Sequence, residues 1–255
     1  MADDDPIDET DTVLLEVEGP VATVSLNRPE ALNALTPGML ERLADVLEQV
    51  ASDDTVQVVV LTGSGRAFSA GVDLKSLNGR RIENGAVGEV LDGPGRRAQA
   101  ALTTMPKVVV ARINGACFTG ALELVLACDL SVAADEAKFG DTHVRWGLRP
   151  TWGMSQRLIR MVGVARARLL TYTAHVFSGA DAARWGLVNA SVPADELDGA
   201  VASLVQALLV NSPSAVAAAK DLYRQALDGG LADGLAYEAA TGYEIPDTMD
   251  RLGTF

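Results

Sequence analysis

The sequence is poor in the residues that form disulfides and bind metals. Of 255 residues only two are cysteines, Cys117 and Cys128, and only two are histidines. Both cysteines lie in apolar surroundings, and neither a Cys-x-x-Cys nor a His-Glu-x-x-His pattern occurs, which predicts buried reduced thiols and no metal site. The acidic N-terminus also lacks the basic-then-apolar order of a signal peptide. We therefore expect a cytoplasmic protein.

Basic residues are also in short supply. The chain has 21 Lys and Arg residues against 34 Asp and Glu residues, for a formal net charge of −13. Nucleic acid and anionic membranes both require a basic surface, so neither is expected as a partner. Six of the acidic residues lie within residues 1–11, which predicts a disordered tail there.

No apolar run is long enough to suggest a membrane span. The nearest candidate, 116–134, contains Glu123 and Asp129 and is interrupted by Gly120. A spanning helix needs about 20 predominantly apolar residues. This stretch is therefore predicted to be a buried helix followed by a strand.

Strand and helix periodicities alternate along the chain. Residues 12–17 and 21–26 predict an antiparallel hairpin, and the apolar spacing over 37–52 predicts a helix. Further strands are expected at 56–62, 107–113 and 129–133, and further helices at 96–104, 120–127, 196–210, 214–228 and 231–243. A mobile stretch is expected at 78–95. This order predicts an α/β fold, either a superhelix of strand-strand-helix units or, from periodicity alone, a doubly wound sheet.

Two segments rich in small residues are the most informative part of the sequence. They are AFSAGVDLK at 67–75 and NGACFTGALEL at 114–124, and each follows an apolar, β-rich run. Each therefore indicates a strand that delivers a small-residue turn to one place. Two backbone N–H groups that converge there on a carbonyl oxygen would form an oxyanion hole, which stabilises enolate-like charge.

Glu123 lies one helical turn beyond Gly120, between apolar neighbours. An unpaired buried carboxylate is costly. The sequence therefore predicts that Glu123 either has a raised pKa suited to proton transfer or forms a structural salt bridge.

The two segments together resemble the crotonase superfamily, also called the enoyl-CoA hydratase/isomerase family. The resemblance spans roughly residues 12–193, through NRPEALNAL at 27–35, ACDL at 127–130, FG at 139–140, QRL at 156–158 and AARWGLV at 182–188. It implies a crotonase-type superhelix of strand-strand-helix units that forms an acyl-CoA-binding core over 12–193. It also implies a C-terminal helical region at 194–255 that supports a homotrimer or a dimer of trimers.

The resemblance also implies the site residues. The N–H groups of Val72 and Gly120 would form the oxyanion hole, and Glu123 matches one of the two glutamates that handle water and a proton during hydration of a 2-enoyl thioester. Implied CoA contacts are Ala31, Ala70, Asp73, Leu74 and Lys75. No cofactor is implied, because CoA is part of the substrate.

Basic residues near these segments are candidates for binding the anionic CoA. They are Arg28, Lys75, Arg80 and Arg81. The alternative, that these residues are ordinary solvated surface charges, fits the sequence equally well.

The chain departs from the family pattern at the second glutamate, whose position holds His143. Histidine can also move a proton near neutral pH, so hydration remains compatible with this residue. A hydrogen-bonded histidine with no proton role is the alternative. Asp141 or Thr142 would be placed to orient its ring.

A second departure lies just beyond, where Trp146 and Trp152 flank or replace a glycine-rich run. Larger side chains there would reshape an acyl pocket. Alternatively, both are core or interface aromatics.

The leading hypothesis is therefore hydration of a 2-enoyl-CoA by Glu123 assisted by His143. A double-bond isomerase that uses Glu123 alone comes next, and a non-catalytic acyl-CoA-binding protein is the third hypothesis. Two other enzyme classes are not supported by the sequence. The G-x-G-x-x-G fingerprint of dinucleotide-binding dehydrogenases begins at Gly63 but has Phe68 in place of its last glycine, and the Gly-x-Ser-x-Gly motif of serine hydrolases is absent.

Overall fold

The computed structural model describes residues 9–77, 79 and 82–253. Residues 1–8 of the predicted disordered tail lie outside this range. The remaining tail residues, 9–11, are instead part of the short 3-10 helix Glu9–Thr12.

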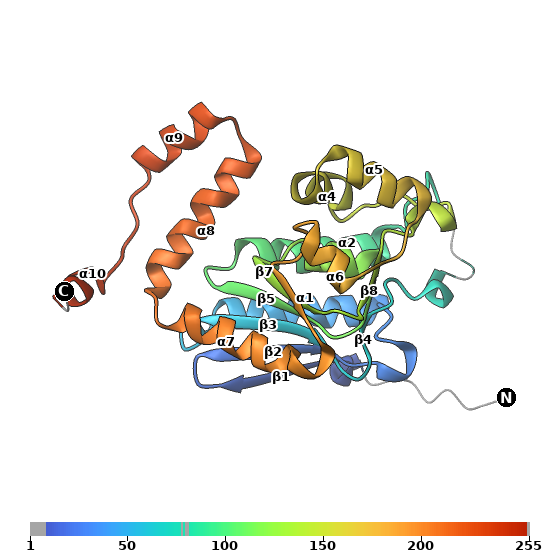
Figure 1. The fold of residues 1–255 in the computed structure, drawn as a ribbon, viewed down its shortest axis with the longest axis horizontal. Helices are drawn as coiled ribbons and strands as arrows, with labels where there is room; N and C mark the ends of the chain where they lie inside the picture. Colours follow the sequence, from blue (N-terminus) through green and yellow to red (C-terminus); the bar gives the residue numbers. More distant parts are fainter. Residues whose placement is uncertain (1–8, 78, 80–81, 254–255) are drawn as a thin grey trace.

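The strands form two sheets (Figure 1). The larger sheet contains, in order, β1 (Val13–Glu18), β2 (Val21–Leu26), β3 (Val58–Gly63), β5 (Val108–Ile113), β7 (Leu130–Ala134) and β10 (Ala190–Val192). The smaller sheet contains β4 (Ala67–Ser69), β6 (Ala116–Phe118), β8 (Lys138–Gly140) and β9 (Phe177–Ser178). The predicted hairpin is confirmed as the antiparallel pair β1 and β2, and the other pairs of the larger sheet are parallel.

Helices lie beside these sheets and beyond them. They are α1 (Pro37–Ala51), α2 (Glu89–Thr104), α3 (Gly120–Val125), α4 (Met154–Val162), α5 (Val164–Thr173), α6 (Gly179–Arg184), α7 (Leu197–Leu209), α8 (Pro213–Asp228), α9 (Leu231–Ala240) and α10 (Thr248–Leu252). Short 3-10 helices occur at Pro29–Ala31, Leu74–Leu77, His143–Trp146 and Ala194–Glu196.

The chain repeats one unit in which a strand of each sheet is followed by a helix. β3 and β4 lead to α2, and β5 and β6 lead to α3. All six residues of β3 are buried, as expected for a parallel strand covered on both faces. This arrangement confirms the crotonase-type superhelix and is not the doubly wound sheet that periodicity would also allow.

Helix α2 begins seven residues before the predicted start at residue 96. Gly93, Pro94 and Gly95 disfavour a helix locally, because proline removes a helical hydrogen bond and glycine lowers helix propensity. In the structure Pro94 and Gly95 are buried inside the helix. A Cβ added at Gly95 would lie 2.4 Å from Cε2 of Trp152, so glycine is what lets this helix approach the tryptophan ring. The predicted mobile stretch is therefore wrong over 89–95, and residues 78, 80 and 81 lie outside the described part of the chain.

Asn33 ties the loop after β2 to the turn before β4 and to the first residues of β4. Its Nδ2 donates to the carbonyl oxygens of Ser64, Ala67 and Phe68 at 2.9–3.2 Å, and its Oδ1 accepts from the Arg28 amide at 2.8 Å. Asn33 is fully buried and has a φ of +55°, a conformation that asparagine tolerates better than most residues. The run at 27–35 therefore fixes the position of the segment that leads into Val72.

Helices α8, α9 and α10 form a C-terminal arm that projects from the rest of the molecule (Figure 1). In α8, α9 and α10 the only buried residue is Ala218. Among the described residues no single helix has the length and apolarity to cross a membrane, and one pair, Ala194–Leu209 with Pro213–Asp228, meets that test jointly but is bent by 102°.

Candidate functional site

The two small-residue segments meet at one edge of the sheets. Because β3 pairs with β5 and β4 pairs with β6, both in parallel, the turns that follow β4 and β6 lie side by side. A Cβ added at Gly71, whose φ is +88°, would lie 2.1 Å from Thr119 Oγ1 and 2.7 Å from the Phe118 oxygen. The prediction that these segments converge is therefore confirmed.

Two backbone amides at this junction have no hydrogen-bond partner among the described residues. The Leu35 amide donates to the Gly71 carbonyl, and the Leu35 carbonyl accepts from the Asp73 amide. These two bonds involve the residues on either side of Val72 and do not use the Val72 amide. Gly120 is the first residue of α3 and follows Thr119, which has a strained φ of +47°. Neither the Val72 nor the Gly120 amide donates to any of the residues that the structure describes.

Glu123 is buried beside these amides, with 2% of the residue exposed. Its Oε1 accepts hydrogen bonds from the amides of Trp152 and Met154, each at 2.9 Å. Burial raises the pKa of Glu123, and this rise outweighs the opposing effects of His143 and of the two amides. Of the two sequence alternatives, the structure favours the carboxyl group with a raised pKa, because no Lys or Arg in the described part of the chain pairs with Glu123.

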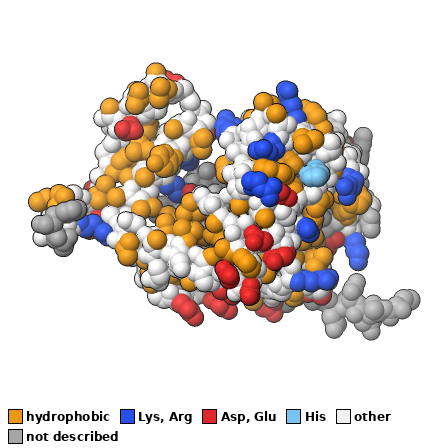
Figure 2. Space-filling view, viewed as in Figure 1, with side chains coloured by type: hydrophobic (Ala, Val, Ile, Leu, Met, Phe, Trp, Pro, Cys, Tyr) orange, Lys and Arg blue, Asp and Glu red, His pale blue; other side chains and the backbone are white. Residues whose placement is uncertain are grey.

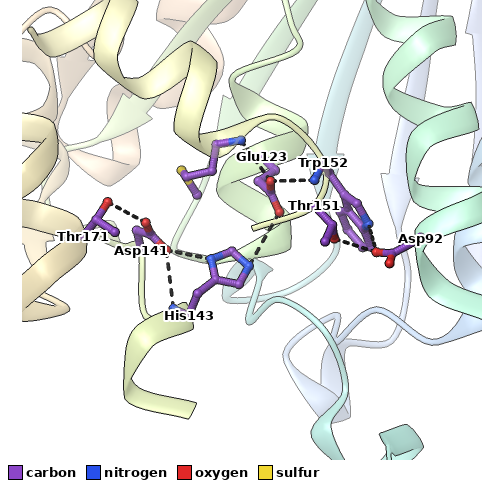
Figure 3. A network of polar contacts seen from close by, with 8 residues as sticks. Asp92, Glu123, Asp141, His143, Thr151, Trp152 and Thr171 are labelled. Carbon is purple, nitrogen blue, oxygen red and sulfur yellow. Dashed lines mark hydrogen bonds and ion pairs between the residues drawn. The ribbon is translucent and has the colours of Figure 1, made fainter. Parts of the chain in front are cut away.

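His143 lies opposite Glu123, at the start of the 3-10 helix His143–Trp146. Its Nε2 is 3.6 Å from Glu123 Oε2, and its Nδ1 is 2.7 Å from Asp141 Oδ1 (Figure 3). The other oxygen of Asp141 accepts a hydrogen bond from Thr171 Oγ1 at 2.7 Å, and Thr171 comes from α5. Of the two neighbours that the sequence offered, Asp141 contacts the ring.

Asp141 is itself buried and held by these contacts. Burial alone would raise its pKa, but the hydrogen bonds from His143 and Thr171 outweigh that effect and leave the pKa of Asp141 below its ordinary value. Asp141 is therefore an ionised acceptor for the ring of His143.

Trp152 forms one wall of the site and is 3% exposed. Its Nε1 donates to Asp92 Oδ1 at 3.0 Å, and Thr151 Oγ1 donates to the same oxygen at 2.5 Å (Figure 3). Asp92 belongs to α2, within the stretch that the sequence suggested to be mobile. The sequence therefore gave no indication that Asp92 supports the site.

These side chains surround a single cavity of about 270 Å³. Val72, Gly120, Glu123 and His143 all line it. Trp146 also lines the cavity but is 56% exposed, so the two tryptophans that the sequence singled out have different environments.

The residues implied as CoA contacts divide into two groups. Ala70 and Leu74 line the cavity, whereas Ala31, Asp73 and Lys75 do not. Asp73 Oδ2 is 3.3 Å from Arg28 Nη1, and the buried Arg28 also donates to the Ala34 carbonyl. This pairing indicates a structural role for Arg28, which is neither of the two alternatives, a CoA-binding cation or a solvated surface charge, that the sequence left open. Lys75 is exposed, and Arg80 and Arg81 lie outside the described residues.

The chain is similar to known proteins over nearly its whole length. The sequence model of a family described as enoyl-CoA hydratase/isomerase matches residues 16–253. A short-chain-enoyl-CoA hydratase of Clostridium acetobutylicum is 33% identical over 244 residues, which cover 95% of this chain and 92% of that protein.

Two further proteins are similar to this chain. A hydroxycinnamoyl-CoA hydratase-lyase of Pseudomonas fluorescens is 37% identical over 219 residues, covering 84% of this chain and 78% of that protein. The crystal structure of an enoyl-CoA hydratase from Bacillus anthracis superposes with a TM-score of 0.87 at 33% identity, covering 96% of this chain and 95% of that one.

Proposed function

Because the chain belongs to the enoyl-CoA hydratase/isomerase family and is an enoyl-CoA hydratase-like enzyme, we propose that Glu123 and His143 hydrate a 2-enoyl-CoA thioester in this cavity. The observation that supports these roles is the placement of two unpartnered amides and two proton-transfer groups around one cavity.

The amides of Val72 and Gly120 would bind the thioester carbonyl oxygen. When water attacks C3 of the enoyl group, negative charge moves onto that oxygen, and preorganised donors stabilise it. Neither amide has to break an existing hydrogen bond with the described residues, so both donors are ready for the substrate.

Glu123 and His143 would handle the water and its protons. Both side chains face the cavity, and their nearest polar atoms are 3.6 Å apart. A water molecule held by both would lie on one side of the substrate plane, close to C2 and C3. Since every step uses only protein groups and water, we expect no cofactor besides the CoA carried by the substrate.

CoA itself would extend from the cavity past Ala70 and Leu74 toward Ala31, Asp73 and Lys75. Of these, Lys75 has an exposed ammonium group that can approach a phosphate. The acyl group would lie between Trp152 and Trp146. We expect the enzyme to act in the cytoplasm.

Product analysis tests this function. We expect the purified protein to convert trans-2-enoyl-CoA thioesters in D₂O to 3-hydroxyacyl-CoA with deuterium at C2, because hydration adds solvent hydrogen there. The panel should include straight-chain, branched and aromatic enoyl groups together with 3-enoyl-CoA, measured by mass spectrometry. Double-bond migration without hydroxylated product would favour the isomerase, and tight binding without turnover would favour a non-catalytic protein.

We also propose that the protein is a homotrimer or a dimer of trimers. Large apolar side chains on the C-terminal arm are exposed in the single chain, and Figure 2 shows hydrophobic groups gathered over these helices. They are Tyr223, Leu227, Leu231, Leu235, Met249 and Leu252. Burying them against other copies would be favourable by about 25 cal/mol per Å².

Replacing Leu231 and Leu235 with lysine is expected to dissociate the assembly, since both lie on one face of α9 and are 82% and 57% exposed. Sedimentation analysis should show three or six chains for the wild type and a smaller species for the variant. Val17→Lys, at a 46% exposed apolar position on β1, is the matched control. A monomeric wild type would contradict the proposal.

A further inference from the structure

The contacts of His143 fix which ring nitrogen carries a proton. Asp141 Oδ1 lies 2.7 Å from Nδ1, and both residues are buried. An ionised carboxylate only accepts hydrogen bonds, so Nδ1 must be the donor in this pair. The free nitrogen, Nε2, then faces Glu123 Oε2 at 3.6 Å.

The contacts of Glu123 are equally asymmetric. Two backbone amides donate to Oε1, so that oxygen is an acceptor in either protonation state. A proton on Glu123 would therefore lie on Oε2, the oxygen that faces His143. Burial, which raises the pKa of Glu123, favours that protonated form.

Building on the proposed hydration, we infer that Asp141 is a positioning residue that makes His143 the base for water and leaves Glu123 as the acid for C2. Thr171 holds Asp141 from the opposite side. The division of roles is therefore set by residues that do not line the cavity as well as by the two that do.

The proton balance of the cycle closes on these two residues. As the water oxygen bonds to C3, Nε2 takes one water proton, and the C2=C3 π electrons move through C2 to the thioester oxygen. The enolate collapses as C2 takes the proton from Glu123 Oε2. After product leaves, imidazolium Nε2–H returns its proton to the Oε2 carboxylate across the 3.6 Å gap, which restores the starting state.

The tautomer can be measured without any activity. The chain contains only two histidines, and His175 is exposed, so ¹⁵N-labelled histidine gives two ring systems that a His175→Gln variant assigns. We expect Nδ1 of His143 to show a protonated-type shift in the wild type and to lose that preference in Asp141→Asn. A neutral His143 protonated on Nε2 would overturn the inference even if the enzyme is a hydratase.

Kinetics then separate positioning from a general effect on folding. Asp141→Asn is expected to lower kcat by roughly 10²–10⁴-fold, the range for losing a positioned base, with KM changed little. A His143→Glu background has no ring to orient, so the loss caused by Asp141→Asn should shrink there by at least about tenfold. Equal losses in both backgrounds, or an unchanged kcat in Asp141→Asn alone, would overturn the assignment.

Asp135→Asn is the matched control for these measurements. Asp135 is only partly buried and lies away from the cavity lining. Wild-type kcat and an unchanged His143 signal are expected for this variant. Should His143→Glu prove inactive, the tautomer measurement still decides the inference.

Discussion

Glu123→Gln is expected to lower kcat for enoyl-CoA hydration by roughly 10²–10⁴-fold, the usual contribution of a positioned acid or base. Glutamine has nearly the same shape and still offers an oxygen to the amides of Trp152 and Met154. It has no acidic proton to give to C2. The variant should therefore keep its fold and its affinity for the thioester while losing turnover, as steady-state kinetics and equilibrium binding of a substrate thioester would show.

The exposed carboxylate of Glu136 offers a matched control. Glu136→Gln makes the same chemical change outside the cavity and should leave kcat within about twofold, as for ordinary surface substitutions. Full activity in Glu123→Gln would contradict both the hydratase and the isomerase assignments, because each depends on this carboxyl group. Loss of binding together with turnover would instead indicate a structural role for Glu123.

Much of the fold follows from local patterns in the sequence. The hairpin of β1 and β2, helix α1 and the strands β3 and β5 lie within a few residues of their predicted bounds, because their apolar spacing is regular and tertiary contacts reinforce it. Helix α2 begins earlier than predicted and includes Gly93, Pro94 and Gly95, which are poor helix residues. Packing of Gly95 against Trp152, 57 positions further along the chain, overrides that local preference.

The candidate site likewise contains residues that the sequence points to and residues that only the structure reveals. Val72, Gly120 and Glu123 belong to two short segments whose resemblance to the family implies their proposed roles, so a pattern in the sequence points to them. Asp92 and Thr171 come from helices distant in sequence. Asp92 accepts hydrogen bonds from Trp152 and Thr151, and Thr171 donates one to Asp141. Aspartate in a helix and threonine in another are common on any surface, so only the three-dimensional arrangement reveals these contacts.

His143 shows how the two kinds of information combine. By the resemblance, its place after the Phe139 and Gly140 pair matches the position at which hydratases of the family have their second glutamate. The sequence leaves open whether the ring has a proton role, whereas the structure places Asp141 on one nitrogen and Glu123 opposite the other. The structure therefore adds a carboxylate partner for the His143 ring that the sequence offered only as one of two neighbours.

Gly120→Ala is expected to lower kcat/KM by roughly 10²–10³-fold, the effect of losing one oxyanion-hole donor. A Cβ at this position would lie 2.7 Å from Cζ3 of Trp152. The ring has no room to retreat, because Gly95 packs against it and Asp92 accepts a hydrogen bond from its Nε1. The displacement must therefore fall on the backbone at Gly120 itself, which carries the amide that we propose binds the thioester oxygen.

Gly199→Ala separates this effect from the general effect of adding a methyl group. Gly199 lies within α7, and an added Cβ there meets nothing within 4 Å, so the change should leave activity intact and stabilise the helix by about 0.4–1 kcal/mol. Kinetics and thermal unfolding of both variants distinguish lost donation from lost folding. If Gly120→Ala keeps its activity within about threefold, the Gly120 amide is not an oxyanion donor, and the thioester oxygen must bind elsewhere in the cavity.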